Sequence, residues 1–391
     1  MKGWVPLLIL ISTGIYAQSF DQVVSSADSL SKRQANKFFN RAVVAGVLYK
    51  NSDTIITRGR INSLGRKVDA EDVFQIGTAS KVFTTLMLAK ELEAGNLSLE
   101  DSIKPYLTNR KRDKFDSVSI YHLATHTSGL QNVTMVVHVP SNLAGAGYGT
   151  IKNALWLTPA NAHWLIKLGP WQAIFMPPLP YFSLYGGAAL KMDLNNASLK
   201  NYGQWRNSNV GIGVLGNILT EKKGLSYEEM LQQEICEPLG LTSTSTEPKN
   251  LPKGKYATPH NMFGIRTIRT QFPKNGMEGA GDVKMSANDM MKFLKLQLNQ
   301  NGPLGEAVKN QQKTYFTDES GDHPGLAMGL GWIKLQQEGE PEILWIRGQV
   351  KGTSAFIGFI PENNVGIFLL ANNNHPKKLS KAGIWWLKQQ L

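Results

Sequence analysis

Short apolar segments with strand character lie near both ends of this chain, and helical patterns lie between them. Residues 43–50 and 54–60 are rich in apolar and β-branched side chains and flank turn-forming residues at 51–53, which is typical of a β-hairpin. Four more such runs lie near the C-terminus, at residues 330–335, 343–346, 354–360 and 365–371. This order predicts one antiparallel sheet built from both chain ends, with a helical region inserted between its two halves.

The helical patterns outline the inserted region. Four segments show the apolar repeat of an α-helix, at residues 82–94, 227–235, 287–298 and 379–391. The first ends before Gly95, and the last would place Trp385 on its apolar side. We expect an α/β (α+β) fold, an antiparallel sheet flanked by helices. Residues 18–77 and 320–391 would form the sheet part, and residues 78–319 the mainly helical part.

The N-terminal residues have the features of a secretory signal peptide. Lys2 precedes an apolar run at residues 5–15, and Tyr16 and Ala17 follow before Gln18. We therefore expect a signal peptide at residues 1–17 and a mature protein in the periplasm or outside the cell. The run is short for a membrane span, so we expect no stable span after signal removal. A buried first helix or an uncleaved anchor remains the alternative.

Charge and cysteine usage restrict the partners that this chain can have. Its formal net charge of +12 would draw a secreted protein to anionic envelope polymers and lipids, while no motif indicates nucleic-acid binding. Cys236 is the single cysteine, so an internal disulfide is excluded and a buried structural thiol is the expected role. The seven histidines show no metal-ligand spacing, and we expect neither a metal nor another cofactor.

A threonine and a lysine stand three residues apart where the first predicted helix begins. Residues i and i+3 share a helix face, so the Lys81 ammonium would lie beside the Thr78 hydroxyl, while Ser80 would point to another face. A hydroxyl is a poor nucleophile until a neighbour accepts its proton, and a helix start adds N–H groups that favour negative charge. This spacing alone occurs in many unrelated helices, and it is the flanking residues that make Thr78 and Lys81 our candidate catalytic residues.

The residues around this pair, and several segments further along, match the motifs of a known superfamily. Phe74-Gln75-Ile76-Gly77 fits an F-x-I-G sequence that precedes a nucleophile, and His122 to Leu130 fits H-L-L-T-H-T-S-G-L. Other matches lie at residues 92–107, 235–241, 285–290, 330–332 and 356–361. The chain thus resembles the serine β-lactamase and penicillin-binding-protein superfamily. The similarity is to its class C β-lactamase, D-alanyl-D-alanine carboxypeptidase and esterase branch, and it implies that fold.

The catalytic motifs of the superfamily are only partly kept. Thr78 stands in place of the serine nucleophile, and Asn207 in place of the tyrosine of the second motif, Y-x-N, whose asparagine matches Asn209. A gapless alignment puts Ile346 where the third motif, K-T-G or H-x-G, has its basic residue, and it matches the motif glycine to Gly348. A gapped alignment would bring Gln349 or Lys351 nearby instead. The resemblance implies substrate-binding positions at Asn207, Asn209 and Gly348.

Two functions follow from this pattern, and the sequence leaves both open. In the first, a secreted enzyme performs slow or specialised acyl-enzyme chemistry on an ester or amide through Thr78 and Lys81. The resemblance implies an oxyanion hole made by the Thr78 N–H and an N–H after Gly348. In the second, a pseudoenzyme binds a peptidoglycan-, lipid- or protein-derived ligand, because a carboxamide at Asn207 cannot move protons.

Three further features lie near the motifs. Residues 131–204 match the superfamily poorly and are a divergent segment, which in the superfamily covers part of the cleft. The segment would be a substrate wall, a packed loop without a ligand, or a loop that touches a membrane. His126 lies in the T-H-T-S-G loop, which is mainly structural in the superfamily, and we favour a structural role. Tyr202 lies five residues before Asn207 and could replace the lost tyrosine, although chance is the better explanation.

Overall fold

A computed structural model describes residues 18–35, 42–62, 65–107, 112–132 and 199–391 except 262, 268, 271 and 273–275, together with 138–140, 181–183, 194 and 197. The expected signal peptide at residues 1–17 lies outside the described residues, as does most of the divergent segment at residues 131–204. Among the described residues, no helix has the length and apolar character needed to cross a bilayer.

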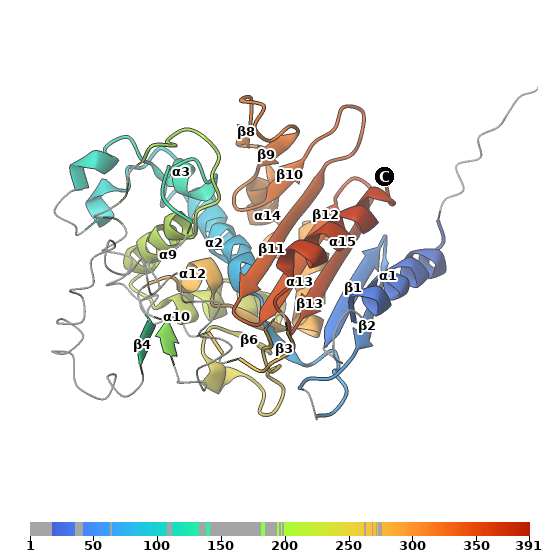
Figure 1. The fold of residues 1–391 in the computed structure, drawn as a ribbon. Helices are drawn as coiled ribbons and strands as arrows, with labels where there is room; N and C mark the ends of the chain where they lie inside the picture. Colours follow the sequence, from blue (N-terminus) through green and yellow to red (C-terminus); the bar gives the residue numbers. More distant parts are fainter. Residues whose placement is uncertain are drawn as a thin grey trace, which may run out of the picture.

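The main sheet joins the two ends of the chain, as the order of apolar segments predicts (Figure 1). Its eight strands lie in the order β2-β1-β13-β12-β11-β10-β9-β8, and neighbours are antiparallel. Val43 in β1 pairs with Arg58 in β2 and with Ala371 in β13. The strands are β1 (Val43–Tyr49), β2 (Ser52–Arg58), β8 (Phe316–Thr317), β9 (Leu326–Met328), β10 (Ile333–Leu335), β11 (Ile343–Val350), β12 (Thr353–Ile360) and β13 (Val365–Ala371).

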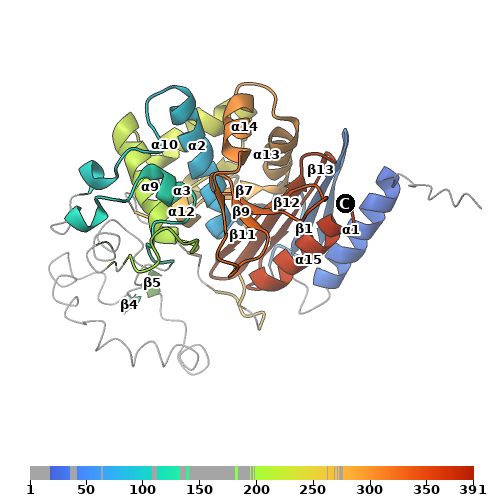
Figure 2. The same cartoon turned by 90° about the horizontal axis from the view of Figure 1, so that it is seen from above.

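Helices cover both faces of this sheet, so its central strands are buried on both sides (Figure 2). In β13, Ile367 and Leu369 pack in a cluster with α1 (Phe20–Ala35) and α15 (Pro376–Lys388). The alternate residues Phe368 and Leu370 belong to the larger core on the other face, which includes α2 (Lys81–Glu93) and α13 (Ala287–Asn299). The period of two in a strand thus separates two cores.

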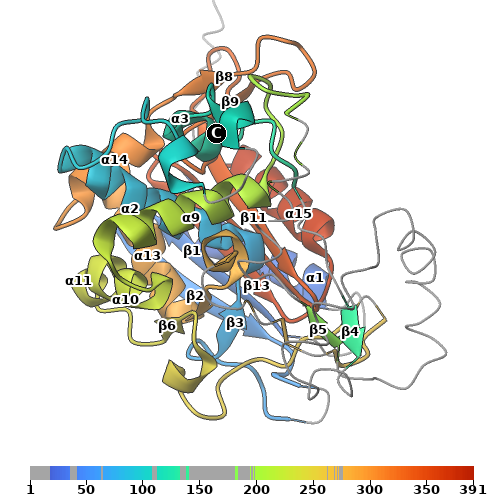
Figure 3. The same ribbon diagram turned by 90° about the vertical axis from the view of Figure 1, so that its left-hand side faces the viewer.

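The inserted region is built around α2 (Figure 3). This helix contacts α9 (Asn209–Lys223), α12 (Glu278–Gly281) and α14 (Gly305–Gln312). A small sheet with the order β3-β7-β6 lies beside it. Its strands and the remaining elements are β3 (Val73–Gln75), β4 (His138–Pro140), β5 (Tyr181–Ser183), β6 (Thr244–Ser245), β7 (Lys284–Ser286), α3 (Ile120–Ala124), α10 (Tyr227–Leu231), α11 (Glu237–Leu239) and the short helices η1 (Gly77–Ser80), η2 (Lys104–Tyr106), η3 (Arg112–Phe115), η4 (a π-helix, Gln232–Cys236) and η5 (Pro248–Asn250).

The α+β fold expected from the sequence is confirmed, and the structure corrects two details. The helix expected at residues 227–235 is divided between α10 and the π-helix η4. The expectation that Trp385 lies on the apolar side of the last helix is wrong, because its side chain is 49% exposed while its neighbour Trp386 is fully buried. Cys236 is buried, and burial raises the pKa of its thiol, as a structural role requires.

Candidate active site

Thr78 lies in η1, directly before α2, and its hydroxyl contacts β11. Oγ1 donates a hydrogen bond to the Arg347 carbonyl at 3.2 Å and accepts one from the Gln349 N–H, also at 3.2 Å. Its side chain is half-buried. Thr78 is thus held between two backbone groups of one strand, and the Gln349 N–H follows Gly348 as the expected oxyanion-hole donor does.

Two glycines permit this close approach of η1 and β11. A Cβ on Gly348 would lie 1.7 Å from the Ile76 carbonyl oxygen, and one on Gly77 would lie 2.4 Å from the Gln349 carbonyl carbon. Gly77 also has φ +57°, a conformation that favours glycine. Because β10 pairs with β11 only as far as Trp345, the rest of that edge is left to meet η1.

Lys81 begins α2 and is 2% exposed, so its amine lies out of water. Nζ donates a hydrogen bond to Asn207 Oδ1 at 2.7 Å. Burial disfavours the ammonium form and, with the positive charge of Arg347 nearby, lowers the Lys81 pKa to about 7. No hydrogen bond joins Lys81 and Thr78 in the described part of the chain, although one helical turn separates them. Lys81 can therefore supply a neutral amine near neutral pH.

Asn207 is positioned by the loop that leads into α9. Its Nδ2 donates to Asn132 Oδ1 at 2.8 Å, which leaves Oδ1 of Asn207 for Lys81. The next residue, Ser208, caps α9 by accepting a hydrogen bond from the Gly211 N–H at 2.8 Å. Ser208 Oγ also donates to the Gln131 carbonyl at 3.0 Å. The helix cap therefore fixes the residue that orients Lys81.

His126 holds this loop in place through two hydrogen bonds. Its carbonyl accepts from the Arg206 N–H at 2.8 Å, and its Nδ1 accepts from the Ser208 N–H at 3.4 Å. The residue has φ +63° and is buried. Burial, and then the charge of Lys81, lowers the His126 pKa well below its usual value, which keeps the ring neutral and able to accept. These contacts support the structural role favoured by the sequence.

The sequence also proposed Asn209 and Tyr202 as residues near the site. Asn209 is the first residue of α9, and its Oδ1 is buried with no hydrogen-bond partner among the described residues. Tyr202 does not point toward Lys81, since its hydroxyl donates to the Ser117 carbonyl at 2.5 Å and its ring packs on His122. The structure thus brings together Thr78, Lys81, Asn207 and Gly348, and it gives Tyr202 a separate contact.

Sequence reasoning missed Arg347. The alignment placed Ile346 at the position of the lost basic residue, and Ile346 is indeed buried in the core. The next residue of β11 points to the opposite face, so the Arg347 side chain is exposed, and its charge lowers the Lys81 pKa. Strand alternation in residues 343–350 was the signal that could have identified this cation.

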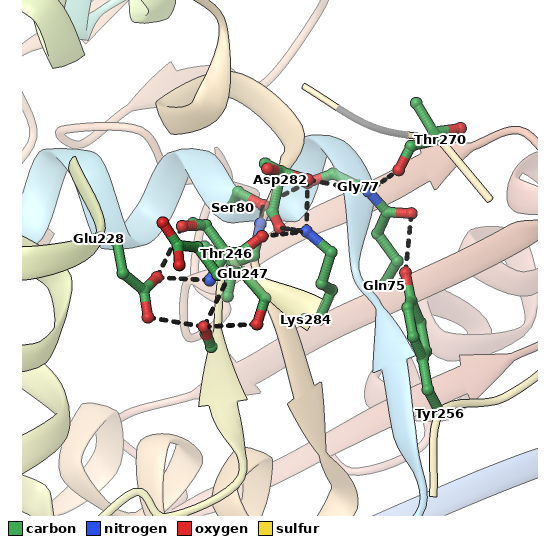
Figure 4. Close-up of polar contacts among 12 residues, drawn as sticks. Gln75, Gly77, Ser80, Glu228, Thr246, Glu247, Tyr256, Thr270, Asp282 and Lys284 are labelled. Carbon is green, nitrogen blue, oxygen red and sulfur yellow. Dashed lines mark hydrogen bonds and ion pairs between the residues drawn. The ribbon is translucent and has the colours of Figure 1, made fainter. Parts of the chain in front are cut away.

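A buried polar cluster lies behind η1 (Figure 4). Ser80 Oγ donates to the Gly77 carbonyl at 2.7 Å and accepts from the Val283 N–H at 3.0 Å, so it faces away from Lys81. Lys284 Nζ forms an ion pair with Asp282 Oδ1 at 2.6 Å, and both side chains are buried. Burial raises the Asp282 pKa to about 7. This cluster holds the base of η1 and does not contact Thr78.

Comparisons with known proteins identify the family and the fold. A family model described as Beta-lactamase matches residues 41–390. The chain is 23% identical over 363 residues to a β-lactamase of Yersinia enterocolitica, covering 84% of this chain and 80% of that protein. It is 24% identical over 323 residues to the D-alanyl-D-alanine-carboxypeptidase/endopeptidase AmpH of Escherichia coli K12, covering 78% and 72%. A class C β-lactamase of Rhodobacter sphaeroides superposes with a TM-score of 0.70 at 21% identity, covering 93% of this chain and 99% of that one.

Proposed function

The chain belongs to the β-lactamase family, and we propose that it performs slow, specialised acyl-enzyme chemistry on an ester or amide. Thr78 is the nucleophile and neutral Lys81 its base. The observation that carries this proposal is the buried amine of Lys81, whose pKa is lowered to about 7 one turn after Thr78. An amine in this state can accept a proton at neutral pH, whereas an exposed lysine cannot.

The reaction requires one rearrangement of the Thr78 side chain. Oγ1 leaves the Arg347 carbonyl, gives its proton to Lys81 Nζ and forms a bond to the substrate carbonyl carbon. The oxyanion accepts from the Gln349 N–H, which already lies 3.2 Å from Oγ1, and from the Thr78 N–H. Collapse expels the leaving group, which takes the proton from Lys81. Water or another acceptor then cleaves the acyl-threonine and restores the hydroxyl.

The slow rate follows from Asn207. A carboxamide does not titrate near neutrality, so Asn207 orients Lys81 but cannot relay a proton. Loss of a general acid–base group typically lowers a rate by roughly 10²–10⁴-fold. The β-methyl of Thr78 also restricts χ1 more than a serine would allow. Lys81 must therefore act alone, as base and then as acid.

The substrate we propose is a small-molecule or peptidoglycan-related acyl compound with an anionic group. Arg347 presents an exposed cation beside the Thr78 contact on β11, where such a group would bind. AmpH, a relative, is named a D-alanyl-D-alanine carboxypeptidase and endopeptidase. The signal peptide proposed at residues 1–17 would deliver the protein to the bacterial envelope, where such substrates occur.

A non-catalytic binder is the second candidate, and one observation favours it. Thr78 Oγ1 uses both its donor and its acceptor on backbone groups of β11 and has no hydrogen bond to Lys81. A side chain that never leaves this position would hold the strand against η1 and would not attack a carbonyl. The ligand would then be bound between β11 and the loop that carries Asn207.

Turnover of acyl substrates separates the two candidates. We expect slow hydrolysis of at least one member of a panel of p-nitrophenyl esters, a D-alanyl-D-alanine peptide and a cephalosporin. Lys81→Ala should abolish it, while Lys253→Ala, a matched change at an exposed lysine, should leave it unchanged. Turnover that persists in Lys81→Ala would exclude this mechanism. Absence of turnover, with tight binding of the same compounds, would support the binder.

A further inference from the structure

The outer surface formed by α1 and α15 combines an apolar groove with a rim of positive charge. The two helices lie side by side on one face of the main sheet, away from the inserted helical region (Figures 1 and 2). Between them is a groove of about 330 Å³. Its apolar lining comes from Leu30, Ala382 and Trp385, and its cations are Arg33, Lys378 and Lys381. We call this region the α1–α15 surface.

The charged residues around the groove are basic. Lys32 and Arg33 lie in the last turn of α1, and α15 adds Lys377, Lys378 and Lys381, all exposed. Residues 29–35 and the whole of α15 contain no acidic residue. None of these five cations forms an ion pair with a carboxylate in the described part of the chain. Such a patch attracts a negatively charged surface more strongly than a patch of paired charges does.

Trp385 adds an exposed apolar side chain to the α1–α15 surface, which purely electrostatic binding would not need. Its side chain is 49% exposed, and the Arg33 guanidinium lies 5.6 Å from the centre of its ring. The next residue, Trp386, is fully buried and donates from Nε1 to Ser26 Oγ at 2.7 Å. Trp386 therefore holds the helices together, whereas Trp385 faces outward. An indole ring flanked by cations is the composition found at lipid headgroup level.

We propose that the α1–α15 surface docks on an anionic lipid bilayer, with Trp385 at headgroup depth and the five cations against the lipid phosphates. An anionic polymer would be held by the charges but gives no use for an exposed indole and an apolar groove. Docking in this way leaves the inserted helical region, which includes α2, on the side of the sheet away from the bilayer. The proposal is independent of whether Thr78 reacts.

Co-sedimentation with vesicles tests the proposal on the chain from Gln18 onward, which contains every described residue. We expect binding to phosphatidylglycerol-containing vesicles, little binding to pure phosphatidylcholine, and loss of binding in high salt. A basic residue near an anionic membrane contributes about 1 kcal/mol, or about fivefold in affinity. Lys378→Glu with Lys381→Glu should therefore weaken binding by about 25-fold or more. Trp385→Ala should weaken it as well, without removing its dependence on salt.

The matched control reverses two exposed lysines elsewhere, Lys253→Glu with Lys313→Glu, and should bind like the wild type. Circular dichroism and the melting temperature would check that each variant is folded, which we expect because the changed side chains are exposed. Equal binding by the two double variants would overturn the proposal, because net charge alone would then explain it. Binding to purified peptidoglycan but not to anionic vesicles would also overturn it.

Discussion

Lys81 is held where a neutral amine is about as stable as an ammonium ion. Burial removes the charge from water, and the Arg347 cation adds repulsion, so the pKa falls to about 7. Asn207 Oδ1 accepts a hydrogen bond from either form and keeps the amine in place. The catalytic proposal therefore depends on one amine whose protonation changes within the physiological range.

Reactivity of Thr78 should follow the deprotonation of Lys81. We expect the rate of Thr78 acylation to rise about tenfold per pH unit below pH 7 and to level off above about pH 8. The lowered Lys81 pKa also affects the free energy of unfolding. Between about pH 7 and pH 10, Lys81 is neutral in the folded protein but protonated in the unfolded chain, whose lysine pKa is about 10.4, so the free energy of unfolding should increase with pH over this range. Labelling rates across pH 5–9 check the first expectation. A rate that does not change across pH 7 would contradict it.

Local spacing explains why part of the site could be predicted. Thr78 and Lys81 lie three residues apart at a helix start, and that relation is visible in the sequence alone. Asn132 could not be found in this way, because its contact with Asn207 joins loops 75 positions apart. The neutral, accepting state of His126 likewise depends on burial and on a backbone φ of +63°, which no local pattern encodes.

The junction between β11 and η1 is the element-level feature on which the site depends. Gly348→Ala would place a Cβ 1.7 Å from the Ile76 carbonyl oxygen, which forces the strand away from the turn. A misplacement of about 1 Å can lower a rate by about 100-fold, and we expect a loss of that size in Thr78 labelling. Gly216→Ala is the control, because its Cβ meets Tyr227 at an ordinary 3.6 Å. Full reactivity of Gly348→Ala would contradict the account.

The ion pair behind η1 should stabilise the fold more at high pH than at low pH. Lys284→Met removes the partner of Asp282, and breaking a buried pair costs about 3–5 kcal/mol. Burial already raises the Asp282 pKa to about 7, so below that pH the carboxyl takes up a proton and the loss becomes smaller. Denaturant unfolding at pH 5 and pH 8 measures the difference. Lys253→Met is the exposed control, and an equal loss at both pH values would be inconsistent with this explanation.

Element length and composition decide which elements the sequence could predict. β1, β12 and β13 are long apolar runs, and α13 has one buried face, so their patterns are distinct. α9 was missed because it is apolar on nearly all sides and contains three glycines, which removes the helical period and lowers the propensity. β3 and β7 are three residues each, too short for a pattern of two to be recognised.

At the level of the whole molecule, α1 and α15 close the outer face of the sheet. Trp386 is the largest fully buried side chain there, and its Nε1 donates a hydrogen bond to Ser26 Oγ in α1. Because the two helices come from opposite ends of the chain, this contact ties the termini together over the sheet (Figure 2). On this face, Trp386 is part of the buried core, whereas Trp385 is part of the exposed surface.

Replacing the two neighbouring tryptophans separates these roles. Trp386→Ala should lower the free energy of unfolding by about 3–5 kcal/mol, since it leaves a cavity between α1, α15 and β12. Trp385→Ala should change it by only about 0.5 kcal/mol, because that ring is half exposed. Chemical denaturation of both variants measures the contrast. Equal losses would mean that Trp385 also belongs to the core.

Formation of a covalent acyl bond on Thr78 would distinguish an enzyme from a binder most directly. Intact-protein mass spectrometry after incubation with a fluorophosphonate, a penicillin and a p-nitrophenyl ester measures this, with Thr78→Ala as control. We expect a single adduct on Thr78 with at least one probe, absent from the control and formed faster at pH 8 than at pH 6. A folded protein that gains no mass from any probe would contradict it and leave the non-catalytic binder as the better description.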